Sequence, residues 1–250
     1  MEFIVIESKK EILLLDNRYV NNNKENNVAL VLGAGASSRM GGQDKIFISI
    51  FGKPLLYYSL TIFEESPLID SIVLVMSQKN IHLAKDLVRK YELNKVKVIC
   101  LGGDSRFQSV ENGLKCIEKA QWVLVHDAAR PCITQELLEE LFDKVQKHGS
   151  AICGRPVFDT LKSVNNLLEI TSTVDRNLLW TVQTPQVFRF SIILDAYKRT
   201  DIEGTDDSTI VEQFHPVNIF CTSPLNLKVT VANDIPIIES ILKSIIDIEI

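Results

Sequence analysis

The segment 28-VALVLGAGASSRMGGQDK-45 joins an apolar run to glycines, small residues and two cations, Arg39 and Lys45. A glycine-rich turn after a strand presents backbone N–H groups that bind phosphate oxygens. Three kinds of nucleotide site fit this beginning: a dinucleotide site, an ATPase-type phosphate loop, and a site where a nucleoside triphosphate is attacked at its α-phosphorus. The neighbouring residues discriminate between them.

The first two kinds of site lack essential parts. The dinucleotide fingerprint requires a glycine where Ser38 stands and a carboxylate at the end of the second strand, which here reads 74-LVMSQKN-80. The ATPase loop closes with Gly-Lys-Ser/Thr, which does not occur. Backbone N–H groups of Gly33, Ala34 and Gly35, together with two cations, suit a triphosphate that releases pyrophosphate. We place nucleotidyl transfer above hydride transfer; for the glycines alone, a plain strand-to-helix turn is an equal alternative.

A second glycine pair occurs in 102-GGDSRFQS-109. Gly103 lets the backbone approach a ligand closely. In isolation, Asp104 is better explained as the N-cap of the following helix than as a ligand-binding residue. Ser109, one turn inside that helix, is expected to point in the same direction. The segment predicts another wall of a ligand site.

The segment 122-WVLVHDAARP-131 ends a buried strand with polar residues. An aspartate at this place, Asp127, can hold Mg²⁺ on phosphate oxygens, and a turn residue is its structural alternative. Ala128 and Ala129 are small enough to leave room for a ligand, and we expect Arg130 to pair with a carboxylate. We interpret His126 as a satisfied histidine at the edge of the core, because the proposed chemistry needs no imidazole base.

Three later residues complete the set of candidates. Arg176 in 173-TVDRNLLW-180 lies on or just beyond a polar arm, where an arginine is otherwise solvated. Thr184 in 183-QTPQVF-188 precedes a turn fixed by proline. Lys228 in 226-NLKVTV-231 interrupts an apolar strand, and an inward lysine there is costly unless an anion meets it.

The elements that position these residues follow one pattern from Val28 onward. Short apolar bursts rich in Val and Ile alternate with amphipathic stretches, which predicts buried parallel strands and covering helices. Repeated β-then-α units predict an α/β, doubly wound, mostly parallel Rossmann-like sheet that binds ligands at the carboxyl ends of its strands. The expected strands are 28–32, 72–76, 96–101, 122–125 and 151–157, and the expected helices are 54–65, 81–91, 105–119 and 134–147.

The two ends of the chain and one internal segment depart from this pattern. Residues 1–27 close with the polar tract 21-NNNKENN-27 and predict an N-terminal extension, flexible apart from a short strand. Residues 159–180 predict a projecting β-arm that packs on another subunit. A helix near 205–214, a strand near 226–231 and a closing helix at 235–246 are expected after it.

The bulk composition limits the function classes. With 27 basic and 32 acidic residues the net charge is −5, which argues against nucleic-acid and membrane-surface binding. An anionic substrate therefore needs local cations. Five scattered cysteines fit neither a zinc site nor a disulfide framework, and we expect a reducing, cytoplasmic setting without a signal peptide or a transmembrane segment.

Taken together, the segments resemble the 2-C-methyl-D-erythritol 4-phosphate cytidylyltransferases of the non-mevalonate isoprenoid pathway. The resemblance covers residues 28–250, read as one cytidylyltransferase domain, and its loop departs from the usual pattern at Gly33, Ser37 and Lys45. The matching motifs, in family order, are LGAGASSRM, GGDSRFQSV, VHDAARP, DTLK, TVDRNLLWTVQTPQ, EGTDDST and NLKVT.

The resemblance implies CTP as donor, a sugar-alcohol phosphate as acceptor, Mg²⁺ as cofactor, and a homodimer whose arms complete each other's sites. It implies that Arg39 and Lys45 stabilise the transition state, while Arg176 of the partner and Lys228 position the acceptor phosphate. Asp127 would sit at the metal and Thr184 near the acceptor. Two alternatives stay open: the sister enzymes acting on ribitol 5-phosphate, and a nucleotide-binding module that has lost turnover. The residues implied to line the nucleotide site are Gly33, Ala34, Gly35, Gly103, Asp104 and Ser109.

Overall fold

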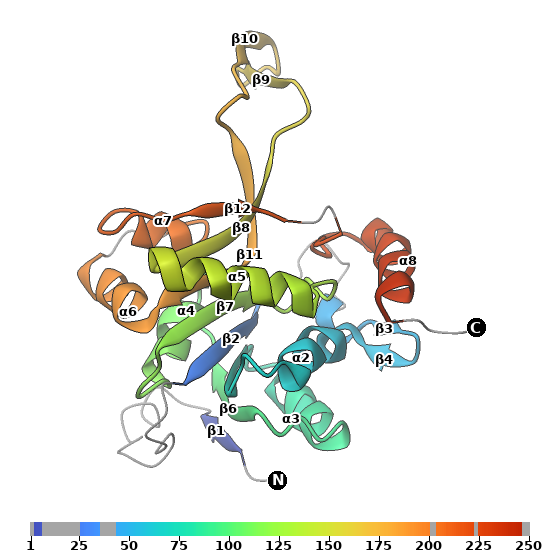
Figure 1. The fold of residues 1–250 in the computed structure, drawn as a ribbon. Coiled ribbons are helices and arrows are strands. Elements are labelled where there is room, and N and C mark those ends of the chain that lie inside the picture. The colour runs from blue at the N-terminus through green and yellow to red at the C-terminus, as the bar shows by residue number, and fades with distance from the viewer. Residues whose placement is uncertain (1–2, 7–25, 36–43, 201–203, 223–224, 247–250) are drawn as a thin grey trace.

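The computed structural model describes residues 3–6, 26–35, 44–200, 204–222 and 225–246. Its centre is an eight-stranded sheet with the order β1-β6-β5-β2-β7-β11-β8-β12 (Figure 1). The strands from β1 to β7 in this order are mutually parallel, and β11 runs antiparallel to both of its neighbours. The strands are β1 Ile4–Ile6, β2 Asn27–Gly33, β5 Ser71–Met76, β6 Val96–Leu101, β7 Trp122–Asp127, β8 Ser150–Pro156, β11 Trp180–Arg189 and β12 Ile219–Cys221.

Strand β2 shows why the sheet is covered on both faces. Ala29 and Val31 belong to one core, and Val28 and Leu30 belong to the other, because successive side chains point to opposite faces of the sheet. One core packs against α2, α3, α5 and α8, and the other against α4, α6 and α7. The doubly wound α/β architecture predicted from the sequence is confirmed. The helices are α2 Leu55–Glu65, α3 Ile81–Lys90, α4 Arg106–Lys115, α5 Gln135–His148, α6 Phe190–Arg199, α7 Asp207–Val211 and α8 Ile235–Ile246.

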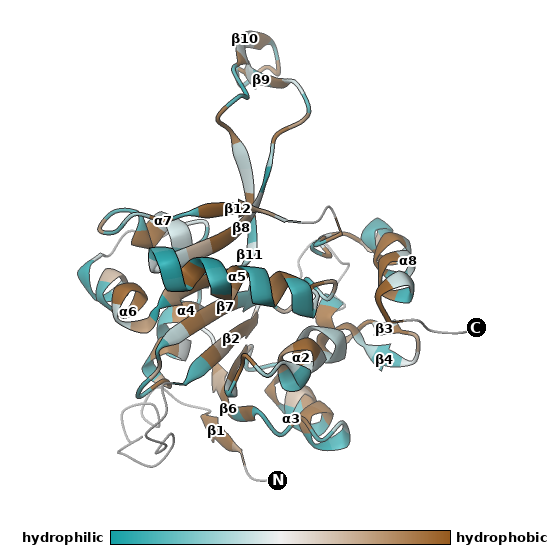
Figure 2. Cartoon of the chain, viewed as in Figure 1, coloured by the Kyte–Doolittle hydropathy of each residue, from teal (hydrophilic) through white to brown (hydrophobic). Residues whose placement is uncertain are grey.

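Helix α5 illustrates how local signals set a helix. The Thr134 side chain accepts from the N–H of Leu137 and caps the start, and Gly149 with φ of 79° ends the helix in the left-handed conformation. Leu138 and Leu141 are buried, whereas the opposite face is hydrophilic (Figure 2). The helix therefore packs one stripe on the sheet and leaves the other in solvent.

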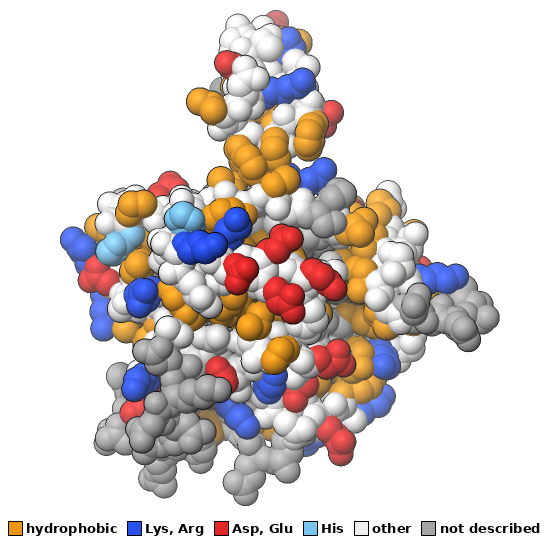
Figure 3. Space-filling view, viewed as in Figure 1, with side chains coloured by type: hydrophobic (Ala, Val, Ile, Leu, Met, Phe, Trp, Pro, Cys, Tyr) orange, Lys and Arg blue, Asp and Glu red, His pale blue; other side chains and the backbone are white. Residues whose placement is uncertain are grey.

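The arm is a hairpin of β9, Leu161–Val164, and β10, Ile170–Val174, which pair with each other outside the main sheet. It projects from the body of the molecule, as predicted (Figure 1). Its apolar side chains are largely exposed: Leu168 is 81% and Leu178 is 91% accessible. In Figure 3 apolar side chains gather where the arm leaves the body.

One short hairpin, two 3-10 turns and the N-terminal strand complete the description. The hairpin of β3, Ser49–Ile50, and β4, Lys53–Pro54, precedes α2, and 3-10 turns occupy Lys45–Phe47 (η2) and Ala232–Asp234 (η3). Strand β1 extends the edge of the main sheet by pairing with β6. Within the described residues, no helix combines the length and apolar character needed to cross a bilayer.

The structure corrects three sequence expectations. Residues 183–188, interpreted as a proline turn, lie within β11; a register shift between Val182 and Gln186 accommodates Pro185, which has no N–H to donate. Residues 226–231, expected to form a strand, are irregular. Side-chain bonds replace a strand ladder there: the Asn226 amide donates to the carbonyl of Thr184 at 2.9 Å. Helix α4 ends at Lys115 rather than at 119.

Candidate active site

A pocket of about 400 Å³ opens at the carboxyl ends of β2 and β7. The chain crosses from one side of β2 to the other at this place, since β2 lies between β5 and β7 in the sheet. Such a switch point is where open α/β sheets bind ligands. The lining residues are Leu32, Gly33, Ala34, Gly35, Asp44, Lys45, Ile46, Gly103, Asp104, Ser105, Arg106, Ser109, Asp127, Ala129 and Lys228.

The two glycine segments meet at one wall of this pocket. A Cβ atom on Gly102 would lie 2.5 Å from Cβ of Ala34, so the loops approach too closely for a side chain there. The N–H of Gly103 donates to Oγ of Ser109 at 3.1 Å, and that hydroxyl donates to the carbonyl of Ser105 at 2.9 Å. The wall predicted from Gly33 to Gly35 and from Gly103 to Ser109 is therefore one surface.

The capping interpretation of Asp104 is wrong. Ser105 is the N-cap of α4, and its side chain accepts from the N–H of Gln108 at 3.2 Å. Asp104 is one residue too early to cap the helix. Its exposed side chain lies instead at the pocket.

The carboxylate of Asp127 lies within 4 Å of three cationic side chains. Its Oδ2 atom lies 2.7 Å from Nζ of Lys228 and 3.7 Å from Nε of Arg130, and its Oδ1 atom lies 3.8 Å from Nε of Arg106. Burial acts to raise the pKa of this carboxyl, but Lys228, Arg106 and Arg130 outweigh it, and the pKa lies well below its usual range. The carboxylate is therefore charged at neutral pH.

A short chain of hydrogen bonds holds the backbone of this segment. The N–H of Asp127 donates to Oγ1 of Thr184 at 3.0 Å, and this hydroxyl lies 3.2 Å from Nδ1 of His126. Nε2 of His126 lies 3.0 Å from the carbonyl of Arg130, which only accepts; Nε2 therefore carries the proton and Nδ1 accepts from Thr184. Burial lowers the pKa of His126 to about 4. His126 is a satisfied, neutral core histidine, as predicted.

Lys45 reaches the pocket from η2. The Asp44 side chain caps this turn by accepting from the N–H of Ile46 at 3.3 Å, and the amide of Asn80 donates to the same carboxylate. Lys45 and Lys228, 183 positions apart by their numbers, line the same pocket. The expected convergence of cations is found for this pair. Arg39 lies outside the described residues.

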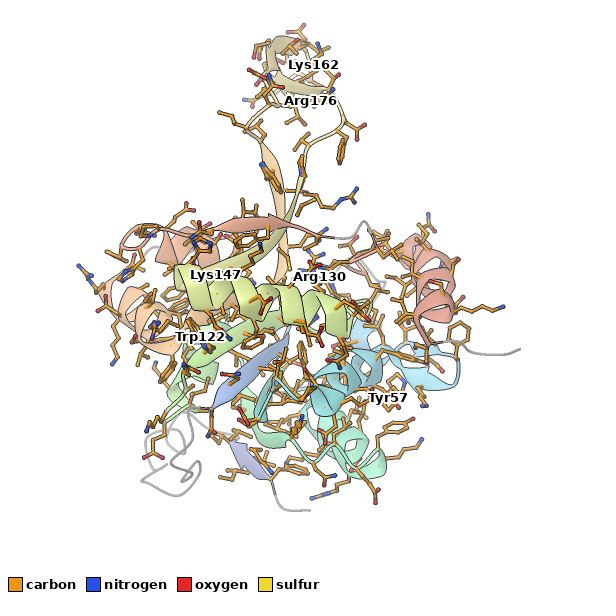
Figure 4. The ribbon with its side chains drawn as sticks, viewed as in Figure 1. Tyr57, Trp122, Arg130, Lys147, Lys162 and Arg176 are labelled. Carbon is orange, nitrogen blue, oxygen red and sulfur yellow. The ribbon has the colours of Figure 1, made fainter. Side chains whose placement is uncertain are left out.

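The other predicted residues differ in their relation to the pocket. Ala128 is fully buried in the core, and its carbonyl accepts from the Ser59 hydroxyl at 2.7 Å. It therefore does not face a ligand, contrary to the prediction. Ala129 does line the pocket. Arg130 pairs with Asp127 as expected and donates to the carbonyl of Asn226 at 3.0 Å. Thr184 acts on the backbone of Asp127, as described above. Arg176 donates to the carbonyl of Phe158 and lies on the arm, away from Arg130 in the body (Figure 4).

Comparison with known proteins decides the family. The profile of the 2-C-methyl-D-erythritol 4-phosphate cytidylyltransferase family matches residues 27–244. The chain belongs to this family. A protein of that name from Dehalococcoides mccartyi is 43% identical over 216 residues, which are 86% of this chain and 95% of the relative. One from Clostridium acetobutylicum is 40% identical over 223 residues, covering 87% and 97%.

Solved structures agree with this assignment. A crystal structure of a 4-diphosphocytidyl-2C-methyl-D-erythritol synthase matches with a TM-score of 0.76 at 30% identity, covering 88% of this chain and all of the other. The synthase from Anaerococcus prevotii gives a TM-score of 0.75 at 26% identity, covering 88% and 99%. The match to the family profile begins at residue 27, next to residue 28, where the cytidylyltransferase domain was predicted to begin.

Arg106 is one of the pocket residues that the sequence analysis did not single out. Arg106 lines the pocket of this cytidylyltransferase and donates through both terminal nitrogens to the buried carboxylate of Asp207, at 2.9 and 2.6 Å. Both residues stand in motifs quoted from the sequence, GGDSRFQSV and EGTDDST. The sequence does contain a signal for this pair. Each of the two motifs holds a charged residue to which no role was assigned, an arginine in the first and an acid in the second.

The charged groups of the described lining balance one another. Lys45, Arg106 and Lys228 face three carboxylates, Asp44, Asp104 and Asp127. A nucleoside triphosphate brings several negative charges, so these residues alone do not neutralise it. No group of three or more His, Cys, Asp or Glu side chains suited to a metal ion occurs in the described part of the chain. Asp127 can supply one carboxylate ligand, which fits Mg²⁺ because that ion commonly shares its coordination with substrate phosphates and water.

Proposed function

We propose that this cytidylyltransferase transfers CMP from CTP to the phosphate of 2-C-methyl-D-erythritol 4-phosphate, giving 4-diphosphocytidyl-2-C-methyl-D-erythritol and pyrophosphate. One observation carries the proposal: Lys45 and Lys228 line a single glycine-walled pocket at the carboxyl ends of β2 and β7. The names of the relatives support the acceptor. No observation favours ribitol 5-phosphate, which remains the alternative to test.

The reaction needs charge stabilisation more than proton transfer. A phosphate monoester, with a second pKa of about 6, is largely dianionic at neutral pH and attacks the α-phosphorus without a general base. Repulsion between the two anions and the charge that develops on pyrophosphate are then the main barriers. Lys45 and Lys228 address both by holding positive charge beside the phosphates, and Arg39 is expected to join them. Backbone N–H groups of the glycine loop orient the triphosphate.

Mg²⁺ is the proposed cofactor, held at Asp127. Asp127 would hold the ion, which would supply positive charge that stabilises the departing pyrophosphate. The balanced charges of the described lining support this proposal, because a divalent cation would supply the excess positive charge that CTP requires. Asp127 is suited to the role through its low pKa, which keeps the carboxylate ionised.

We further propose a homodimer in which each arm completes the partner's pocket with Arg176. The exposed apolar side chains of the arm support an interface, since Phe158 is 68% and Leu178 is 91% accessible in the isolated chain. The arm projects away from the body of its own chain (Figure 1). A cytoplasmic location stays a prediction.

A pyrophosphate-release assay tests the proposal. The protein is incubated with CTP, with or without Mg²⁺, and with either 2-C-methyl-D-erythritol 4-phosphate or ribitol 5-phosphate. We expect pyrophosphate only with CTP, Mg²⁺ and the methylerythritol acceptor. Turnover with ribitol 5-phosphate alone would transfer the assignment to the sister activity, and CTP binding without release for either acceptor would indicate a binding module.

A further inference from the structure

Asp207 is a fully buried carboxylate at the first position of α7. An unpaired charge in such a place is strongly unfavourable, so its partners carry information. Arg106 donates to both carboxylate oxygens, and the hydroxyl of Tyr197 donates to Oδ1 at 2.7 Å. Planar two-point bonding of this kind fixes the orientation of a guanidinium as well as its position.

Arg106 occupies a place where a helix does not favour a cation. It is the first residue of α4, at the positive end of the helix dipole. Burial also disfavours its charge, but Asp207 outweighs this, and the pKa of the guanidinium lies above its ordinary value. The neighbouring Phe107 stacks on Tyr197, with ring centroids 4.8 Å apart. The stack and the Tyr197 hydroxyl therefore hold Asp207, which in turn holds the guanidinium at the pocket.

Nε is the guanidinium nitrogen of Arg106 that makes no bond to Asp207. The terminal nitrogens of Arg106 are used by Asp207, while Nε lies 3.8 Å from Oδ1 of Asp127. The other oxygen of Asp127, Oδ2, is held by Lys228 at 2.7 Å. Oδ1 of Asp127 thus faces Arg106, whereas Oδ2 faces Lys228 and Arg130, and rotation of the carboxylate would separate these pairs.

The buried pair is also tied to the strand that supports Asp127. The side chain of Gln186 on β11 donates to Asp206 at 2.7 Å and accepts from the N–H of Ser208 at 3.0 Å. These bonds secure the residues on either side of Asp207. Thr184, on the same strand, accepts from the backbone of Asp127. Residues of β11 therefore help to hold both Asp207 and Asp127 in position.

We propose that Asp207 and Arg106 form a positioning pair for Asp127: Asp207 orients the guanidinium, and the guanidinium fixes the rotation of the Asp127 carboxylate in the nucleotide pocket. Neither residue of the pair is required to touch substrate for this role. The inference rests on the proposed cytidylyl transfer, in which Asp127 acts on the triphosphate. It predicts that damage to the pair slows turnover through Asp127 rather than weakening the capture of CTP.

Two single variants test the pair. Asp207→Asn removes the charge at nearly constant shape, and Arg106→Lys keeps the charge but removes the two-point geometry. Each should lower kcat by roughly 10- to 100-fold, as for other residues that orient a functional carboxylate. The Kd for CTP, measured by calorimetry without acceptor, should change by less than about threefold. The same substitutions in the exposed pair Asp195 and Arg199, whose side chains are 47% and 54% accessible, are the matched controls and should retain kcat.

A double variant separates positioning from a general structural effect. If the pair acts through Asp127, adding Arg106→Lys to Asp127→Asn should lower kcat less than about twofold further, whereas independent effects would multiply. Multiplying effects, or a rise in the Kd for CTP that accounts for the whole loss, would overturn the proposal. Thermal unfolding checks each variant. If Asp207→Asn fails to fold, the partly exposed Arg106 carries the test through Arg106→Lys. Absence of wild-type turnover would instead contradict the proposed function, independently of the pair.

Discussion

Nζ of Lys228 lies 2.7 Å from Oδ2 of Asp127, although 101 positions separate the two residues in the chain. Lys228 reaches the pocket from an irregular segment, where Val229 donates its N–H to the carbonyl of Ala129 at 2.9 Å. This single backbone bond joins the segment to the end of β7. The side chain of Lys228 is 36% accessible and lines the pocket.

Lys228→Met should therefore lower kcat/KM by roughly 10²–10³-fold, the loss typical of one charge-stabilising group. The methionine keeps most of the side-chain volume but carries no charge to offset the phosphates. The measurement is pyrophosphate release at varied acceptor concentration. Lys119→Met, at an exposed position, is the control and should match the wild type. Equal kcat/KM for the Lys228 and Lys119 variants would exclude Lys228 from the reaction.

Gly103→Ala should disturb the wall of the pocket without removing any functional group. An added Cβ would lie 2.3 Å from Cβ of Gln108 and 3.2 Å from its backbone carbonyl carbon, so the first turn of α4 would have to move. We expect a loss of stability of about 1–3 kcal/mol, typical of overpacking, together with a raised KM for CTP. Urea unfolding and steady-state kinetics measure the two effects. Unchanged values for both would mean that the α4 turn adapts freely.

The fold was predictable where a local pattern decides it. Strands β2, β5 and β7 contain continuous apolar runs, and β6 contains one after Lys97, as is typical of strands that are buried on both faces. Strand β11 was missed because Pro185 and its polar neighbours are typical of a turn, and only pairing with β7 and β8 makes them a strand. The segment at 226–231 shows the opposite error: Asn226 and Val229 donate to the backbone carbonyls of Thr184 and Ala129, and within the described residues no ladder with a neighbouring strand forms.

The site was predictable to the same extent. Residues at the carboxyl ends of strands, such as Gly33 and Asp127, were found because parallel strands bring these ends to one edge of the sheet. Arg106 and Asp207 were not, because 101 positions separate them and no spacing rule reports an ion pair across that distance. Asp104 was misread for a related reason. Two adjacent residues, Asp104 and Ser105, both suit an N-cap, and propensity alone does not choose between them.

Stability should depend on pH through His126. Burial lowers its pKa to about 4, against an ordinary value near 6.5. The unfolded chain therefore binds a proton more readily than the folded one, so this contribution is full above about pH 6.5 and is lost as the pH falls toward 4. The loss is on the order of 3 kcal/mol.

Urea unfolding at a series of pH values measures the effect. His126→Gln, which does not titrate, should show a shallower decline than the wild type between pH 6.5 and 4. The His126 imidazole resonances of the folded protein should titrate only near the lower end of this range. A folded-state pKa above 6 by NMR would contradict the interpretation of His126 as a neutral core residue.

The proposed exchange of arms predicts that each pocket needs residues from two chains. Arg176 lies on the projecting arm, whereas Asp127 lies in the pocket of the body (Figure 4). If each pocket uses the partner's arginine, then Arg176→Ala and Asp127→Ala should each be inactive as homodimers. A heterodimer of the two variants holds one pocket in which both residues are intact. Random exchange should thus restore about a quarter of the wild-type specific activity, since half of the dimers are mixed and each has one good site.

Mixing the two variants, with subunit exchange followed by native mass spectrometry, measures this recovery. A double variant carrying both substitutions in one chain, mixed with the wild type, is the control and separates complementation from simple dilution. Its heterodimer has no restored pocket, because each pocket lacks either Asp127 or the partner's arginine. Activity that stays absent after proven exchange of the single variants would show that Arg176 does not act across an interface.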